Sequence, residues 1–155
     1  MAYVTVADVE SRCTGLLTAI NPTNKVFSTT TIPTLAQVGL FITDAENTLN
    51  AYLEAINIST PLATNSKGAL AAKIPILDYV VGMVYSNYSR SGGDDGDIDG
   101  EDMIKRYYDH LKAIERNPQH YRKVYSSATS PVTGHYFTED IPDPMYTLTN
   151  TKKDF

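Results

Sequence analysis

Three alternating carboxylates in one loop are the residues of this sequence that come closest to a recognisable chemical site. Residues 95–100 read DGDIDG and match the first six positions of a calcium loop, in which Asp95, Asp97 and Asp99 would converge on one cation. The twelfth position, which should supply a bidentate carboxylate, is the cation Arg106. The sequence therefore contains half of an EF-hand motif and does not support a complete one.

A second interpretation of this loop needs no metal ion. Carboxylates are stabilised near the N-terminus of a helix, where the backbone dipole is positive, and a helix is predicted directly after the loop. Asp102 also stands where calcium loops usually carry an apolar residue. We therefore predict an exposed acidic loop and assign no metal ligands, with a calcium-binding loop as the alternative.

The histidines and the cysteine form no catalytic or metal-binding pattern. His110, His120 and His135 are irregularly spaced and have no cysteine partner or HExxH arrangement, so a zinc site is not indicated. Cys13 lies on the apolar side of a predicted helix without a neighbouring histidine to activate it. We expect it to be a small core residue.

No cofactor site or acid/base pair is indicated either. The glycines within residues 92–96 follow no predicted strand and form neither a GxGxxG nor a GxxxxGK loop. Glu101, Asp102 and Asp109 are typical of a solvated helix surface. The sequence therefore predicts a protein that is not an enzyme and needs no cofactor.

The composition is that of a single globular domain. The 155 residues are 42% apolar and 20% charged, which fits neither a disordered chain nor a membrane protein. No run reaches the roughly 18 apolar residues of a membrane span, and the N-terminus has none of the features of a signal peptide. A net charge of −5 without basic clusters disfavours specific binding to nucleic acid. A single cysteine fits a reducing compartment.

Apolar residues at steps of three and four predict an all-α chain. A first helix is predicted over residues 6–20, with Thr5 as its N-cap. The clearest pattern begins after a second N-cap, Thr34, and predicts a helix over residues 35–56. Residues 25–32 are β-branched and polar, and they predict an extended loop or an isolated strand.

Two further helices complete a predicted bundle of about four. Ser66 is expected to cap a helix that is apolar around most of its circumference and should be the most buried one. Pro75 falls inside this pattern, so the helix either kinks there or begins there. The fourth helix is predicted over residues 101–116 and stops at Pro118. The predicted inner stripe of the third helix consists of Leu70, Ile74, Leu77, Val81, Val84 and Tyr88.

Residues 119–155 are predicted to be an extended C-terminal arm outside a bundle domain of residues 1–118. The periodicity weakens after Pro118, and the following segment is rich in serine, threonine and proline. The arm nevertheless carries more apolar side chains than a solvated tail needs, so a neighbouring subunit or a partner protein is expected to cover them. These candidate interface residues are Tyr136, Phe137, Ile141, Met145, Tyr146, Leu148 and Phe155.

Two stretches of the sequence form a pattern that is typical of one protein family. Residues 3–9 (YVTVADV) open a helix, and residues 27–38 (FSTTTIPTLAQV) lead into a long amphipathic helix. In this order they resemble the head-to-tail adaptor (connector) proteins of tailed bacteriophages. Two further helices follow in that family, and residues 66–90 and 101–116 correspond to them here. The glycine- and aspartate-rich loop and the long arm depart from the family pattern.

This resemblance implies a small α-helical bundle that assembles as a homo-oligomeric ring of about twelve copies below the portal protein. The ring would extend the DNA channel without binding DNA specifically, and it would give the stopper or tail protein a platform. The protein would be made in the host cytoplasm and used in the neck of the virion, with no membrane involved. A small helical interaction module with a calcium-binding acidic loop is the alternative of a different class.

We predict that Asp95, Asp97 and Asp99 do not form a tight calcium site. Because Arg106 stands where the bidentate ligand belongs, calorimetry of the purified chain should show no calcium binding tighter than about 10⁻³ M, the range of weak modules. A stoichiometric isotherm in the micromolar range would contradict this assignment.

Overall fold

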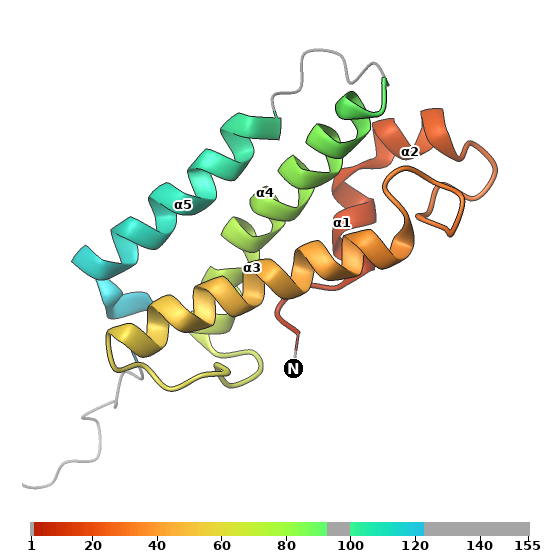
Figure 1. Ribbon diagram of the computed structural model, residues 1–155. Helices are drawn as coiled ribbons and strands as arrows, with labels where there is room; N and C mark the ends of the chain where they lie inside the picture. The colour runs from red at the N-terminus through yellow and green to blue at the C-terminus, as the bar shows by residue number, and fades with distance from the viewer. Residues whose placement is uncertain (1, 93–99, 123–155) are drawn as a thin grey trace, which may run out of the picture. The chain divides into compact units, whose positions relative to one another are not determined.

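The computed structural model describes residues 2–92 and 100–122, all within one compact unit, Met1–Arg122. In these residues every regular element is a helix (Figure 1). The elements are α1 (Val6–Arg12), α2 (Thr14–Ile20), α3 (Leu35–Ala55), α4 (Lys67–Arg90), α5 (Gly100–Arg116) and the short 3₁₀ helix η1 (Pro118–His120). The predicted all-α bundle is therefore confirmed, with five α-helices in the described part where about four were expected.

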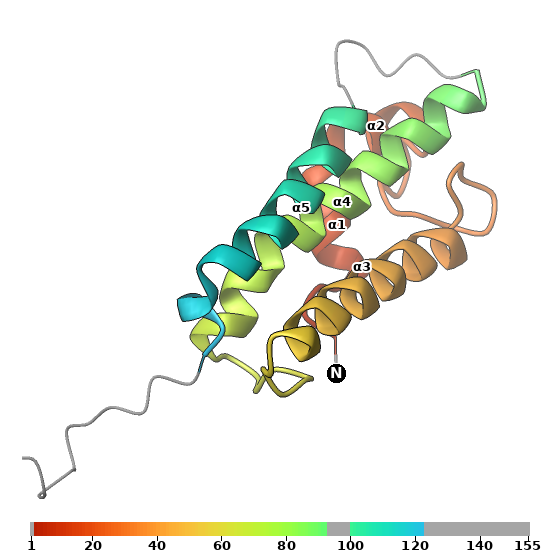
Figure 2. The same ribbon diagram turned by 60° about the vertical axis from the view of Figure 1, so that its left-hand side comes forward.

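The central helix of the bundle is α4. It packs against α5, α3 and α1, and both views show α5 running antiparallel along it (Figures 1 and 2). Ten of its 24 residues are buried, against five of 21 in α3. Ser66 caps α4 by accepting a hydrogen bond from the amide of Ala69. The helix begins at Lys67 and continues through the buried Pro75, so it does not begin at the proline.

The predicted helix over residues 6–20 is instead two short helices that meet at Cys13. The amide of Cys13 donates to the carbonyls of both Val9 and Glu10, and its backbone leaves helical geometry with φ −100° and ψ 21°. The break reorients α2, so that Leu17 becomes fully buried while Ile20 is only half-buried. A periodicity of three and four alone could not reveal this, because it assumes one straight axis.

Residues 25–32 form a loop without strand structure. Phe27 anchors the loop in the core, and its amide donates to a carboxylate oxygen of Glu10. Thr31 is buried, and its hydroxyl lies 3.1 Å from the carbonyl oxygen of Ser28 and 2.9 Å from that of Pro33. These contacts provide hydrogen-bond partners within the loop, which leads directly to the N-cap of α3.

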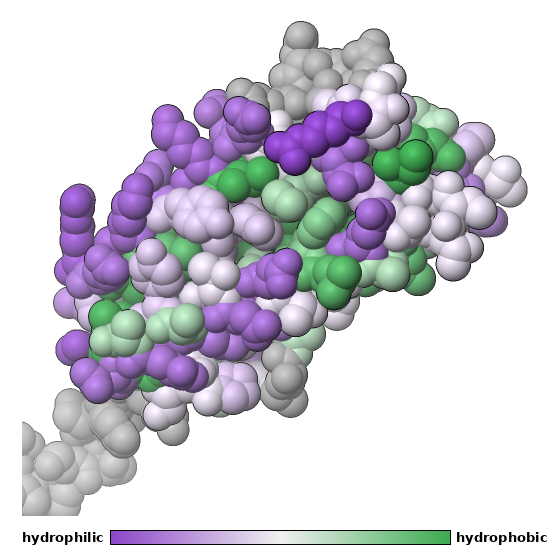
Figure 3. Space-filling view, in the orientation of Figure 1, coloured by the Kyte–Doolittle hydropathy of each residue, from purple (hydrophilic) through white to green (hydrophobic). Residues whose placement is uncertain are grey.

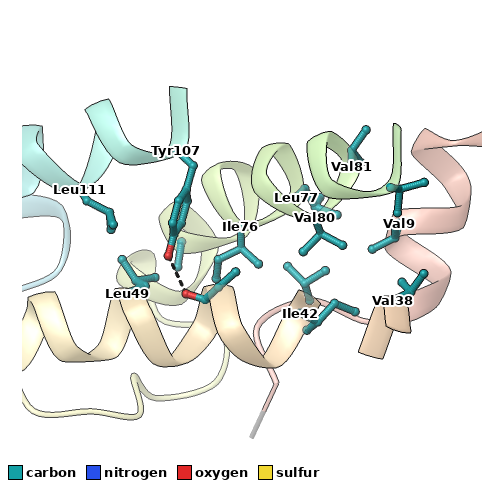
Figure 4. Close-up of a cluster of buried hydrophobic side chains, with 14 of the residues drawn as sticks. Val9, Val38, Ile42, Leu49, Ile76, Leu77, Val80, Val81, Tyr107 and Leu111 are labelled. Atoms are coloured by element: carbon teal, nitrogen blue, oxygen red, sulfur yellow. Dashed lines mark hydrogen bonds between the residues drawn. The ribbon is translucent and has the colours of Figure 1, made fainter. Parts of the chain in front are cut away.

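Side chains from α3, α4 and α5 interlock in one core. Leu49 of α3, Ile76 of α4 and Leu111 of α5 are all fully buried (Figure 4). Tyr107 of α5 reaches across to α3, where its hydroxyl donates to the carbonyl of Ala45 at 2.6 Å. Burial raises the pKa of Tyr107 well above its ordinary value, so this donor stays protonated.

The closest approach between α4 and α5 is made by two glycines. A Cβ atom on Gly82 would lie 2.5 Å from the carbonyl oxygen of Gly100, and one on Gly100 would lie 2.6 Å from that of Gly82. Because both contacts are with backbone atoms, rotating a side chain could not relieve them. The two glycines therefore fix the point at which α5 begins against α4.

The packed unit extends past Pro118. Tyr121, which the sequence places in the arm, is only 5% exposed. Its hydroxyl lies 2.8 Å from Nε2 of His110, and burial raises its pKa to about 12. His110 is therefore part of a structural contact on α5.

We predict that Leu49 and Leu77 belong to one core, since they are 0% and 5% exposed. Truncating either to alanine should lower the free energy of unfolding by about 2–5 kcal/mol, because the lost contacts leave a cavity. Leu70→Ala is the matched control on α4, and it should have a much smaller effect because Leu70 is 60% exposed. Denaturant unfolding measures all three, and a loss below about 1 kcal/mol at Leu49 or Leu77 would contradict the assignment.

Candidate interaction surface

One apolar stripe on α4 is buried along its second half and exposed along its first. Leu77, Val81 and Val84 are at most 5% exposed, whereas Leu70 and Ile74 are each 60% exposed. All five recur at steps of three and four, so they share one side of the helix. The sequence predicts the whole stripe to be buried, and this prediction is wrong for its first two residues.

The stripe becomes buried where α1 crosses α4. Nζ of Lys73 lies 2.7 Å from a carboxylate oxygen of Asp8, and Arg12 pairs with Asp78 at 3.5 Å. These ion pairs hold the two ends of α1 against α4 at positions 73 and 78. Val9, between them on α1, is fully buried on the α4 side (Figure 4). Leu70 and Ile74, which precede position 77 in the stripe, remain exposed beside this crossing.

The ion pair between Lys73 and Asp8 positions α1 on α4 and contributes little to the stability of the fold. The hydrogen bond from Lys73, followed by that from the backbone of Thr5, lowers the pKa of Asp8 below its ordinary value. This contribution to stability is present above the pKa that Asp8 has in the unfolded chain, and it is lost as the pH falls through the lower folded value. Because both side chains are partly exposed, solvent weakens the interaction.

A hydrogen-bond network around Tyr3 forms the structure next to the exposed stripe. A carboxylate oxygen of Glu46 accepts from the amide of Tyr3, whose hydroxyl donates to Asn50 at 2.7 Å and accepts from the amide of Leu62 at 2.9 Å. Burial raises the pKa of the Tyr3 hydroxyl, so it remains a donor at neutral pH. The network ties the N-terminal segment, α3 and the loop before α4 together.

A shallow hollow lies beside Leu70 on this side of α4. Lys67 is exposed at the start of the helix, and Lys73 is half-buried one turn beyond Leu70. We use the name α4 surface for Lys67, Leu70, Lys73 and Ile74. It combines two large apolar side chains with two cations, of which Lys73 is paired with Asp8. The hollow is lined by Ala2, Tyr3, Leu62, Thr64, Asn65, Ala69, Leu70 and Lys73.

Leu35, at the first position of α3, is 43% exposed and prolongs the buried stripe of α3 by one residue. Three other exposed apolar side chains do not continue a core stripe. Val26 and Ile32 lie in the loop before α3, and Leu40 lies on the outer side of α3. Figure 3 shows apolar side chains interspersed among polar ones on one face, with strongly polar ones along α5. Single exposed apolar residues of this kind are normal on a protein surface. The α4 surface differs because two successive residues, Leu70 and Ile74, each 60% exposed, prolong the buried stripe.

In the described part of the chain, the residues with reactive side chains are not arranged as a catalytic site. Cys13 is fully buried, and burial raises its thiol pKa to about 12, as expected of a core residue. Asp109 forms an exposed ion pair with Lys112 on α5. No group of three histidine, cysteine or carboxylate residues within 2–92 and 100–122 could hold a metal ion.

The calcium half-motif and the candidate interface of the arm lie outside the described residues, and so does His135. These positions are Asp95, Asp97, Asp99, Tyr136, Phe137, Ile141, Met145, Tyr146, Leu148 and Phe155. The α4 surface is therefore the candidate interaction surface that the described residues provide.

By length and composition α4 also meets the requirements of a membrane-spanning helix. This is weak evidence, because the core helix of a bundle passes the same test. Of the most apolar stretch of α4, 56% is buried inside the protein. We therefore interpret its hydropathy as that of a core helix with one uncovered apolar edge.

Comparisons of the chain with protein-family models, with curated proteins and with solved structures find no match. The α4 surface and the sequence pattern are therefore the observations that bear on function.

Proposed function

We propose that this protein is a structural subunit of the neck of a tailed bacteriophage, a head-to-tail adaptor that forms a homo-oligomeric ring below the portal protein. The observation that carries the proposal is the α4 surface, where a core stripe continues uncovered at Leu70 and Ile74. A stripe of this kind suits a subunit that completes its packing against another protein. The pattern in residues 3–9 and 27–38 supports the choice of assembly.

The order of helices supports the same proposal. The threonine-rich loop before Thr34 leads into the long amphipathic α3, and α4 and α5 follow. The capping boxes at Thr5 and Thr34 are both formed, so the two stretches that carry the resemblance define the starts of α1 and α3. In the adaptor family this order belongs to a small bundle that repeats around a ring.

The charge of the chain suits a ring through which DNA passes. The net charge is −5, and the exposed residues of α5 include cations and anions in mixed order. A wall without a basic patch does not hold phosphate groups, so DNA can slide along it. The ring would extend the channel and offer the stopper or tail protein a platform, with no catalysis and no cofactor.

A helical interaction module with a calcium-binding acidic loop is the second candidate. The same α4 surface would serve such a module, but its association with a partner would depend on calcium and would not form a closed ring of identical copies. Native mass and calcium dependence therefore separate the two proposals.

The proposal predicts that the full-length chain assembles into a particle of many identical copies, about twelve, at micromolar concentration. Native mass spectrometry should give this mass with calcium or with a chelator, because the assembly depends on apolar packing and not on a metal ion. A mass that changes with calcium would favour the interaction module. A monomer at every concentration, alone and with purified heads that carry a portal, would contradict the adaptor.

A further inference from the structure

We propose that the α4 surface is the docking site for residues 136–148 of a second copy of this chain. The inference rests on the proposed ring and names the contact that would link one subunit to the next. The arm is thereby given a binding surface, which could not be located from the sequence alone.

The receiving surface suits a partner that is partly apolar. Leu70 and Ile74 are one helical turn apart and each 60% exposed. The hollow beside Leu70 is supported by Tyr3, which is fixed by hydrogen bonds to Asn50 and to the amide of Leu62. A rigid support limits the loss of conformational freedom when a segment binds.

The chain itself carries a segment of matching chemistry. Residues 136–148 (YFTEDIPDPMYTL) contain six of the seven apolar residues of the candidate interface, together with Glu139, Asp140 and Asp143. They contain no lysine or arginine. The α4 surface carries the exposed cation Lys67 beside its apolar pair, while Lys73 is already paired with Asp8. The opposite charge of Lys67 beside the apolar contact favours this pairing.

The connecting chain can span more than the length of α4. The 3₁₀ helix η1, which leads to the last described residue Arg122, packs on α4 and lies near its first turn in both views (Figures 1 and 2). Residues 123–135 then precede the segment, and an extended chain of this length spans at most roughly 45 Å. This exceeds the length of α4 itself, which is about 36 Å for 24 residues.

A contact between two copies follows from the proposed ring. The segment and its receiving surface are different parts of the chain, so their pairing between copies is heterologous. Such a contact repeats from each copy to the next and closes into a ring when the rotation permits. Pairing within one chain would occupy both parts and leave none for a neighbour.

Cysteine cross-linking of the full-length protein tests this contact. Native Cys13 does not interfere because it is fully buried. Two separate variants, Leu70→Cys and Tyr146→Cys, are mixed under mild oxidation and analysed on a denaturing gel. We expect a disulfide-linked dimer in the mixture and not in either variant alone, and Ile74→Cys should behave like Leu70→Cys. Leu40→Cys is the matched control, because Leu40 is equally exposed but lies on α3.

The double variant Leu70→Cys, Tyr146→Cys distinguishes pairing between chains from pairing within one chain. A ladder of linked chains upholds the proposal, and a fast-running monomer with an internal disulfide overturns it. No disulfide at all, or equal linking through Leu40→Cys, overturns it as well. A charge exchange adds an independent measurement: Lys67→Glu should lower the yield several-fold, and Asp140→Lys in the partner chain should restore it.

Native mass of the same samples separates this inference from the proposed function. A closed ring without the cross-link contradicts the inference and leaves the ring in place. A cross-link in particles of only two or three copies upholds the contact and contradicts the ring. Monomers without a cross-link contradict both.

Discussion

The burial of α4 is the constraint on which the rest of this bundle depends. A 24-residue apolar helix must be covered along most of its length, and each neighbour is held to it by a specific contact. The pair Gly82 and Gly100 lets α5 approach at backbone distance. Tyr107 links α5 to α3 through its hydrogen bond to the carbonyl of Ala45. Two ion pairs, including that of Lys73, fix where α1 crosses.

The position at which α1 begins limits how much of α4 it covers. α1 has seven residues and is about 10 Å long, roughly a third of the length of α4, and its N-terminal part is paired with α4 at Lys73. It covers the stripe near Leu77, and the N-terminal segment then turns away to hydrogen-bond with Glu46 on α3. Leu70 and Ile74 are left exposed. The proposed assembly uses this edge, which the subunit's own short helices cannot reach.

The elements of this fold could be predicted from the sequence, and their contacts with one another could not. Capping residues such as Thr34 and Ser66 are local signals, so the starts of the longest helices were predicted correctly. The break at Cys13 and the exposure of Leu70 depend on packing between segments that are distant in the sequence. The periodicity of apolar residues contains no information about such packing. Tyr3 and Asn50 are 47 positions apart, so no local sequence pattern could predict their hydrogen bond.

The central claim is that one apolar stripe serves the subunit's own core at Leu77 and a partner at Leu70. Introducing an aspartate at each position, with Leu40→Asp as an exposed control, tests this claim when thermal unfolding and native mass are measured together. Leu77→Asp should abolish cooperative unfolding, because a charge cannot be buried there without a partner. Leu70→Asp should keep the unfolding transition of the unmodified protein but lose its assembly, and Leu40→Asp should keep both. Unfolding of Leu70→Asp together with Leu77→Asp, or full assembly of Leu70→Asp, would contradict the account.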